Sequence, residues 1–248
     1  MHVLPAIKRF GLFAMTVASI SALGQPVTVV TEEYPPYNFY DASQNKISGM
    51  GTEVVEEILK RTKLDYRLGI YPWARAYQMA QEAPNVLIYS IGRSGLRESL
   101  FKWVGVIAPY DVYLYSLKDR PEIKVRSLDR AKRYKIGAVR EDVRAQYLEQ
   151  ANIPLDLVID DSANAKKLAS QRIDLFPIDE LGMVALYKRE GLDPHSVVKA
   201  FNLKALSAGL YMAFSKETSD ALVQRCQVAL ADIKRDGTFE RIRLKYLK

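Results

Sequence analysis

The chain has 248 residues, of which 48% are hydrophobic and 26% are charged, as in globular proteins with a sizeable core. Its formal net charge is +7, but acids and bases are interspersed and no basic stripe carries interleaved aromatic residues, so we expect no nucleic-acid binding. The single cysteine excludes an intrachain disulfide and cysteine-type zinc sites, and two histidines leave little for a histidine-type site. We therefore expect no metal and no cofactor.

The first 24 residues have the pattern of a secretory signal peptide. Lys8 and Arg9 form a basic start, residues 10–23 are apolar or small, and Ala22-Leu23-Gly24 offers small residues for cleavage. An uncleaved membrane anchor is the alternative, but the apolar run is shorter than the roughly 20 residues that span a bilayer. We expect a soluble periplasmic protein with a net charge of +5, because cleavage removes two basic residues and no acidic ones.

The first predicted strand is residues 27–31, a compact β-branched segment. Two consecutive prolines hold the loop after it extended and rigid. Rigid aromatic residues just past a strand end are suited to stacking on a ligand. We expect one of Tyr34, Tyr37 and Phe39 to line a cleft and the others to cover the edge of the core.

Two helices and a further strand are predicted next. Thr52 is a fair N-cap for a helix with its apolar face at residues 54–59. Residues 64–70 alternate as a strand, and a second helix begins with Pro72 near its first turn. Trp73 lies just outside the start of that helix, where it is either a stacking platform for a ligand or a core residue.

The stretch 87–98 carries the first indication of function. An apolar run ends here in small, polar and cationic residues, so a strand stops at a turn with free backbone N–H and C=O groups. Arg93 and Arg97 lie beside those groups, and Arg97 can grip a carboxylate through two parallel charge-assisted hydrogen bonds. We expect this turn to form half of an anion-recognising cleft. The alternative is a surface loop in which Arg97 pairs with Glu98 or another surface acid.

From residue 112 onward strands alternate with helices, which is typical of mostly parallel sheets with covered faces. Strands are expected at 112–115, 134–139, 157–159, 173–178 and 210–214. Helices are expected at 143–150, 163–171, 180–189 and 220–234, followed by a short C-terminal helix. Cys226 has helical spacing from apolar neighbours in the last long helix, so we expect a buried, inert thiol rather than a nucleophile.

Two α/β units in tandem, with a trailing strand and helices, predict two lobes. The trailing segment needs a place to pack, and the economical solution is a return to the first unit. We therefore expect lobe 1 to comprise residues 25–112 and 211–248 and lobe 2 to comprise residues 113–210, joined by two hinge crossings. Ligand clefts in such sheets lie beyond the carboxyl ends of strands and at domain interfaces.

This layout resembles the periplasmic solute-binding proteins of the amino-acid-binding family 3, which have the type II two-lobed fold, over essentially all of residues 25–248. Residues 33–37 are similar to the family's first-strand exit loop, and residues 90–97 resemble the segment whose arginine clamps a ligand carboxylate. Residues 136–140 resemble the strand that enters the second lobe. Residues 172–179 resemble the segment that delivers an aspartate to the ligand ammonium group.

The resemblance implies roles for individual residues. Arg97 binds the ligand carboxylate, and Asp179 binds its ammonium group from the opposite lobe. This pair suits a zwitterion, because closure removes both charges from water. The other residues that the resemblance places at the ligand are Tyr34, Trp73, Ser90 and Gly92. For Asp179 the alternative is a helix N-cap, a role that can coexist with ligand binding.

The sequence also departs from the family pattern. It has Glu141-Asp142-Val143 where small residues usually let backbone N–H groups approach the carboxylate, with Asp142 as a further candidate ligand contact. Extra cations for the cleft are available at Arg75, Arg93 and Arg140, for which solvated side chains are the alternative. An ordinary α-amino acid ligand is therefore in doubt.

The resemblance implies a monomeric binding protein, not an enzyme. Its partners would be a small ligand with a carboxylate and the permease of an ABC transporter or a sensor. A rival is an enzyme on the same fold, since some relatives resemble cyclohexadienyl dehydratases, with Glu32, Glu33 or Glu141 as general acid or base. A ligand sensor without a transporter is the other alternative.

Overall fold

The computed structural model describes residues 26–247, so the predicted signal peptide lies outside the described residues. The strands are β1 (Val27–Thr31), β2 (Phe39–Asp41), β3 (Lys46–Ser48), β4 (Tyr66–Ile70), β5 (Val86–Gly92), β6 (Phe101–Ala108), β7 (Val112–Leu117), β8 (Ile136–Val139), β9 (Leu155–Val158), β10 (Phe176–Asp179), β11 (Val197–Asn202) and β12 (Leu210–Ser215). The helices are α1 (Met50–Thr62), α2 (Trp73–Glu82), α3 (Leu128–Ala131), α4 (Val143–Gln150), α5 (Asp161–Ala169), α6 (Glu180–Arg189), α7 (Asp220–Arg235) and α8 (Thr238–Lys245), with 3₁₀ turns η1 (Pro194–Ser196) and η2 (Lys204–Leu206).

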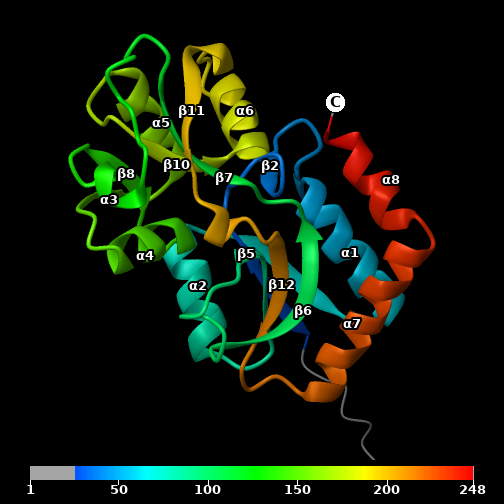
Figure 1. Cartoon of the computed structure of the whole chain (residues 1–248). Coiled ribbons are helices and arrows are strands. Elements are labelled where there is room, and N and C mark those ends of the chain that lie inside the picture. Colours follow the sequence, from blue (N-terminus) through cyan, green and yellow to red (C-terminus); the bar gives the residue numbers. More distant parts are fainter. Residues whose placement is uncertain (1–25, 248) are drawn as a thin grey trace, which may run out of the picture.

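Lobe 1 is built on a five-stranded sheet in the order β4-β1-β5-β12-β6. β1 pairs parallel with β4 and β5, whereas β12 pairs antiparallel with β5 and β6. Side chains of β5 point to both faces, so that Leu87 and Tyr89 join the core under α1 and α7 while Ile88 and Ile91 join the core under α2. Helices therefore cover both faces of this sheet (Figure 1).

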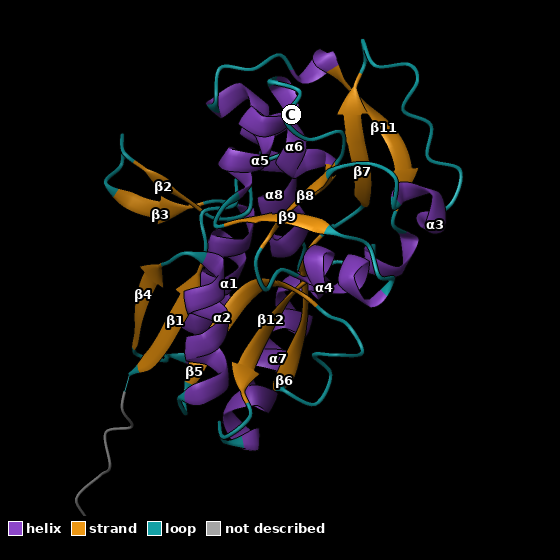
Figure 2. Ribbon diagram, turned by 90° about the vertical axis from the view of Figure 1, so that its left-hand side faces the viewer, coloured by secondary structure: helices purple, strands orange, loops and turns teal. Residues whose placement is uncertain are grey.

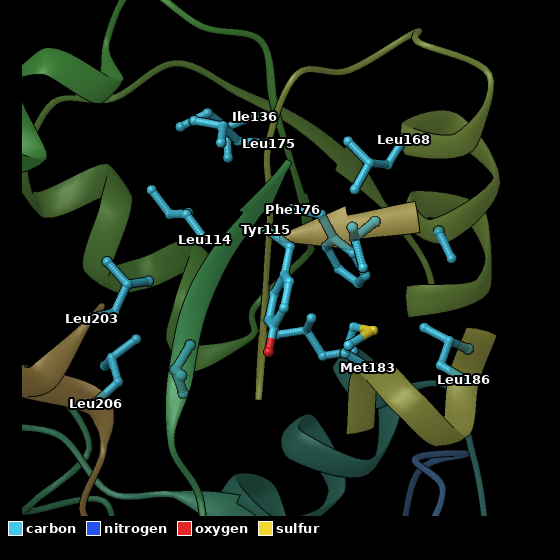
Figure 3. Packing of buried hydrophobic residues seen from close by; sticks show 14 of the residues in the cluster. Leu114, Tyr115, Ile136, Leu168, Leu175, Phe176, Met183, Leu186, Leu203 and Leu206 are labelled. Atoms are coloured by element: carbon cyan, nitrogen blue, oxygen red, sulfur yellow. The ribbon is translucent and has the colours of Figure 1, made fainter. Parts of the chain in front are cut away.

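Lobe 2 contains a three-stranded sheet in the order β10-β7-β11 and a parallel pair, β8 and β9. β7 pairs antiparallel with both of its neighbours. Leu114 and Tyr115 of β7 pack with Phe176 of β10 and Met183 of α6 in one buried cluster (Figure 3). Figure 2 shows β7 and β11 above the sheet of lobe 1, with α4 and β9 in the region between them and that sheet.

The chain crosses between the lobes twice, between β6 and β7 and between η2 and β12. The two crossings lie close together, because the backbone N–H of Val112, the first residue of β7, donates to Ser207 Oγ at 3.1 Å and that of Leu203, just before η2, donates to the Val112 carbonyl oxygen at 2.9 Å. The predicted two-lobed α/β fold is confirmed. The structure adds that both sheets of three or more strands are mixed or antiparallel, because β7 and β12 run against their neighbours.

Several local predictions require correction. Thr52 lies inside α1, which begins at Met50 after Gly49, and the Thr52 hydroxyl instead contacts Ser48 and Tyr89. Trp73 is the first residue of α2 rather than a residue outside it. Cys226 is buried as predicted, and burial raises the pKa of its thiol to about 11. Among residues 26–247, no helix combines the length and the apolar character needed to cross a membrane.

Candidate functional site

Arg97 lies in the loop after β5 and is fully buried between the lobes. Its Nη1 donates to the Gly92 carbonyl oxygen at 3.0 Å, its Nη2 donates to the Glu141 carbonyl oxygen at 2.7 Å, and its Nε donates to Gln146 Oε1 at 2.9 Å. Glu141 and Gln146 belong to lobe 2, so two of these three bonds cross the cleft. Burial lowers the pKa of the guanidinium. The alternative that Arg97 pairs with Glu98 is wrong, because Glu98 pairs with Arg93.

Glu141 supplies the backbone carbonyl at which the two lobes meet. This oxygen accepts from Arg97 and also from Trp73 Nε1 at 2.9 Å. The residue has a φ of 62°, a left-handed conformation that costs a non-glycine residue about 1–2 kcal/mol. Strain of this kind is found where the surrounding structure fixes the backbone for a purpose. Here the left-handed turn accompanies a carbonyl that receives two donors from lobe 1.

Asp179, the last residue of β10, is buried and faces lobe 1. Its Oδ1 accepts from the Gly182 backbone N–H at 2.9 Å and from the Tyr37 hydroxyl at 2.6 Å, and its Oδ2 accepts from the Tyr34 hydroxyl. The predicted N-cap role for α6 is confirmed. Burial raises the pKa of Asp179, and the hydrogen bonds to both tyrosines oppose that rise. The carboxylate that would meet a ligand ammonium group thus already has three donors from the chain.

A buried ionic cluster, Arg144 with Asp142 and Asp161, lies beside this contact. Arg144 Nε is 2.6 Å from Asp142 Oδ1, and Arg144 Nη2 is 3.0 Å from Asp161 Oδ2. The guanidinium also lies 5.4 Å from the centre of the Tyr34 ring. Burial opposes the charge on Arg144, but the two carboxylates hold its pKa well above the ordinary value. Burial raises the pKa of Asp161 to about 6.

The sequence did not point to Arg144, Gln146 or Asp161. Asp142 caps α4 by accepting from the Arg144 backbone N–H, but an N-cap spacing does not predict that the Arg144 side chain pairs with the same carboxylate. Asp161 is 17 positions from Arg144 along the chain, so no local pattern connects them. Glu32 had been noted only as one of three acids for the enzyme alternative.

An interlobe cavity of about 270 Å³ opens between the end of β1, the start of α2 and the start of α5. Lobe 1 contributes Glu32, Glu33, Ile70, Tyr71, Pro72 and Trp73, and lobe 2 contributes Ile159 and Asp160. Among the described residues that line this cavity, neither Arg97 nor Asp179 is present. The cavity between the lobes therefore does not surround Arg97 and Asp179, the two residues predicted to bind the charged groups of the ligand.

The predicted glycine and serine lie on the lobe 1 side of the contact. Gly92 faces Val143 of α4 so closely that a Cβ at position 92 would lie 2.6 Å from Val143 Cγ1. Only a residue without a side chain permits this approach of the lobes. Ser90 has a φ of 57° at the bulge in β5, and its hydroxyl lies against Gly51 of α1.

The three extra arginines do not gather at the cleft centre. Arg93 makes a bidentate ion pair with Glu98, with Nε 2.8 Å from Oε2, and its guanidinium lies 5.2 Å from the centre of the Trp103 ring. Arg75 and Arg140 are exposed, and Arg75 packs over the Tyr71 ring. In the described residues, no group of His, Cys, Asp and Glu side chains is arranged to hold a metal ion.

Comparison with known proteins identifies the family of this chain. The profile of bacterial extracellular solute-binding proteins, family 3, matches residues 27–248. No curated protein sequence matches the chain. Among solved structures, an ancestral arginine-binding protein bound to arginine is similar with a TM-score of 0.77, at 19% identity over 90% of this chain and 98% of that chain.

Two other similar structures are a sensor domain and a periplasmic binding protein. A histidine kinase sensor domain similar to periplasmic binding proteins has a TM-score of 0.75, at 18% identity over 90% of this chain and 96% of that one. A periplasmic binding protein of the His/Glu/Gln/Arg/opine family from Silicibacter pomeroyi, in complex with lysine, has a TM-score of 0.72. It is 18% identical over 89% of this chain and 96% of that one. At these identities the structures establish the fold, and the family match covers both lobes: the chain belongs to the bacterial extracellular solute-binding proteins of family 3.

Proposed function

We propose that the chain captures a small polar solute between its two lobes in the periplasm, as a monomer, and delivers it unchanged to the permease of an ABC transporter. Lobe 1 would comprise residues 25–112 and 211–248, lobe 2 residues 113–210, and residues 1–24 would be removed on export. One observation carries this proposal: polar side chains from each lobe reach the other, Arg97 to Glu141 and Tyr34 to Asp179.

Such contacts suit a cleft that opens and closes. Groups that form hydrogen bonds between the lobes can bond to water or ligand atoms instead. No donor or acceptor is therefore left unsatisfied in the open or the closed state. The cavity at the same interface gives a solute a place in contact with both lobes.

The residues that the family resemblance assigns to an amino acid are engaged with the chain itself. A ligand carboxylate at Arg97 would have to displace Gln146 and one of two carbonyl oxygens. An ammonium group at Asp179 would have to displace the hydroxyls of Tyr34 and Tyr37. We therefore propose that these contacts hold the closed state and that Trp73, which lines the cavity, contacts the solute.

The test is a thermal-shift screen of purified protein with amino acids, organic acids and amines, followed by calorimetry and recovery of the ligand. The proposal expects a solute that raises Tm and is recovered unchanged. Turnover of prephenate or arogenate would instead support the dehydratase-like alternative. Gly92→Val should abolish binding, because the added side chain would meet Val143 and keep the lobes apart. Gly95→Val is the matched control, since a Cβ there meets no atom within 4 Å.

A sensor role is the second candidate, favoured by the similarity to a histidine kinase sensor domain. Deletion of the gene separates the two. Loss of uptake of the solute found in the screen supports transport. Normal uptake with loss of a solute-induced transcriptional response supports the sensor.

A further inference from the structure

We propose that the interlobe cavity binds an organic cation with an apolar body and no carboxylate, and that the carboxylate of Glu32 is its charge partner. This inference rests on the proposed function, because it names the class of solute captured between the lobes. It differs from the amino-acid zwitterion that the family resemblance implies.

The charges around the cavity are of one sign. Three of its eight lining residues are acidic, and none of the described lining residues is basic. Glu33 is already paired, with Oε1 2.7 Å from Arg189 Nη1. Asp160 caps α5 by accepting from the Ala163 backbone N–H at 2.9 Å. Of the three acidic residues that line the cavity, this leaves Glu32 as the one whose carboxyl group has no hydrogen-bond or ion-pair partner among residues 26–247.

Glu32 is 8% exposed, and the cavity is where its side chain meets open space. Within residues 26–247, its carboxyl group has no hydrogen bond or ion pair, although its backbone carbonyl oxygen accepts from Asn38. A buried carboxylate without a partner tends to take up a proton rather than stay charged. A bound cation would supply the missing partner.

The charged groups that face Glu32 do not replace that partner. Asp142 and Asp161 raise its pKa together with burial, while Arg144 and Arg97 lower it, and the net result is a pKa well above the ordinary value. Both arginines are committed elsewhere, Arg144 to two carboxylates and Arg97 to three oxygens. The local balance is therefore short of one positive charge.

The walls of the cavity select an apolar body. Tyr71 and Trp73 offer aromatic surface, with Ile70, Pro72 and Ile159 around them. Ile159 of lobe 2 is 71% exposed, and a ligand in the cavity would cover part of its side chain. The cavity volume of about 270 Å³ leaves room for a small organic ion. Aromatic walls with one unpaired carboxyl group, that of Glu32, are a suitable environment for an alkyl ammonium or guanidinium ion.

Two matched pairs of probes test the claim by calorimetry on the mature chain. Agmatine has the guanidinium and alkyl chain of arginine without the carboxylate, and cadaverine is related to lysine in the same way. We expect agmatine or cadaverine to bind at least tenfold more tightly than the corresponding amino acid. Glu32→Gln should weaken the amine at least tenfold, while the surface control Glu98→Gln should leave it unchanged.

The pH dependence of binding gives a second readout. Affinity of the wild-type chain for the amine should rise with pH as Glu32 loses its proton, and the rise should be absent in Glu32→Gln. Tighter binding of arginine or lysine, or an unchanged affinity in Glu32→Gln, would overturn the inference. An amino acid or organic acid that binds while amines do not would overturn it but leave the proposed function standing. Failure of every solute in the screen would contradict both.

Discussion

The Arg97 guanidinium donates through Nη2 to the Glu141 backbone carbonyl oxygen at 2.7 Å, and this bond joins the two lobes. The arginine is fully buried, and the carbonyl belongs to a residue in a left-handed conformation. The side chain that the family resemblance assigns to a ligand carboxylate thus binds the chain's own backbone. Among residues 26–247, this fully buried cation therefore has internal partners from both lobes.

Replacement of Arg97 by alanine should therefore cost stability as well as any effect on binding. The change removes the Arg97 donor from the Gly92 carbonyl oxygen and leaves the Glu141 carbonyl oxygen with Trp73 as its remaining donor. We expect a loss of about 3 kcal/mol in the free energy of unfolding, measured in urea. Arg93→Ala, which removes a surface ion pair, is the control and should change stability far less. Equal effects of the two substitutions would show that Arg97 does not hold the lobes.

The Asp179 carboxylate predicts a graded series. Asp179→Ala removes the cap of α6 and the acceptor for the Tyr34 and Tyr37 hydroxyls, so we expect a loss of about 3 kcal/mol in unfolding free energy. Asp179→Asn keeps an oxygen for the cap and should cost about 1 kcal/mol. The comparison is made by denaturant unfolding at pH 7. If the two variants were equally stable, the side-chain oxygen that caps α6 would contribute nothing.

Arg144→Met should be strongly destabilising and sensitive to pH. It leaves the buried carboxylates of Asp142 and Asp161 without their cation, a change that typically costs about 3–5 kcal/mol. Protonation neutralises unpaired carboxylates, so the loss should be smaller at pH 5 than at pH 7. Arg120→Met, which removes an exposed cation paired with Glu122, should show a small loss that does not shrink in this way. A pH-independent loss in Arg144→Met would contradict the ionic role.

Glu32 should impose a pH dependence on the stability of the ligand-free chain. Burial, with Asp142 and Asp161 nearby, raises its pKa in the folded state. Its contribution to stability is therefore fully present below the unfolded pKa of about 4.5 and is lost as pH rises through the folded pKa. Glu32→Gln removes this contribution, so the Tm of the variant minus that of the wild type should increase as pH rises from 4.5 to 8.

Glu98 provides a control of opposite sign for that measurement. The ion pair with Arg93 lowers the pKa of Glu98, so its contribution is present above its unfolded pKa and is lost as pH falls. Glu98→Gln should therefore lose stability relative to the wild type as pH rises. The same slope in both variants would mean that the buried carboxyl has no special environment.

Local periodicity was enough to predict much of the fold. α4 and α6 have the bounds expected from the sequence, residues 143–150 and 180–189. β6 was missed because its burial repeats irregularly, with register shifts against β12 and Gly105 at a φ of 155°. β11 was missed because it is largely exposed and contains Lys199. Neither strand has the alternation that identifies a half-buried strand.

The site was predictable only in part, for a different reason. Arg97 was predicted from its place at a turn after a strand and Asp179 from the family resemblance, and both are buried at the contact between the lobes. What each side chain bonds to depends on residues from the other lobe, Glu141 and Gln146 for one and Tyr34 and Tyr37 for the other. No sequence pattern relates positions so far apart, and the cavity beside them is a product of that same packing.

The most direct test of solute capture between the lobes is a crystal structure of the mature protein with the ligand found in the screen. The account predicts density for the solute in the cavity bordered by Glu32, Tyr71 and Trp73 of lobe 1 and by Ile159 and Asp160 of lobe 2. A solute bound away from the interlobe contact, for example in the surface groove between Arg61 of α1 and Arg225 of α7, would contradict it.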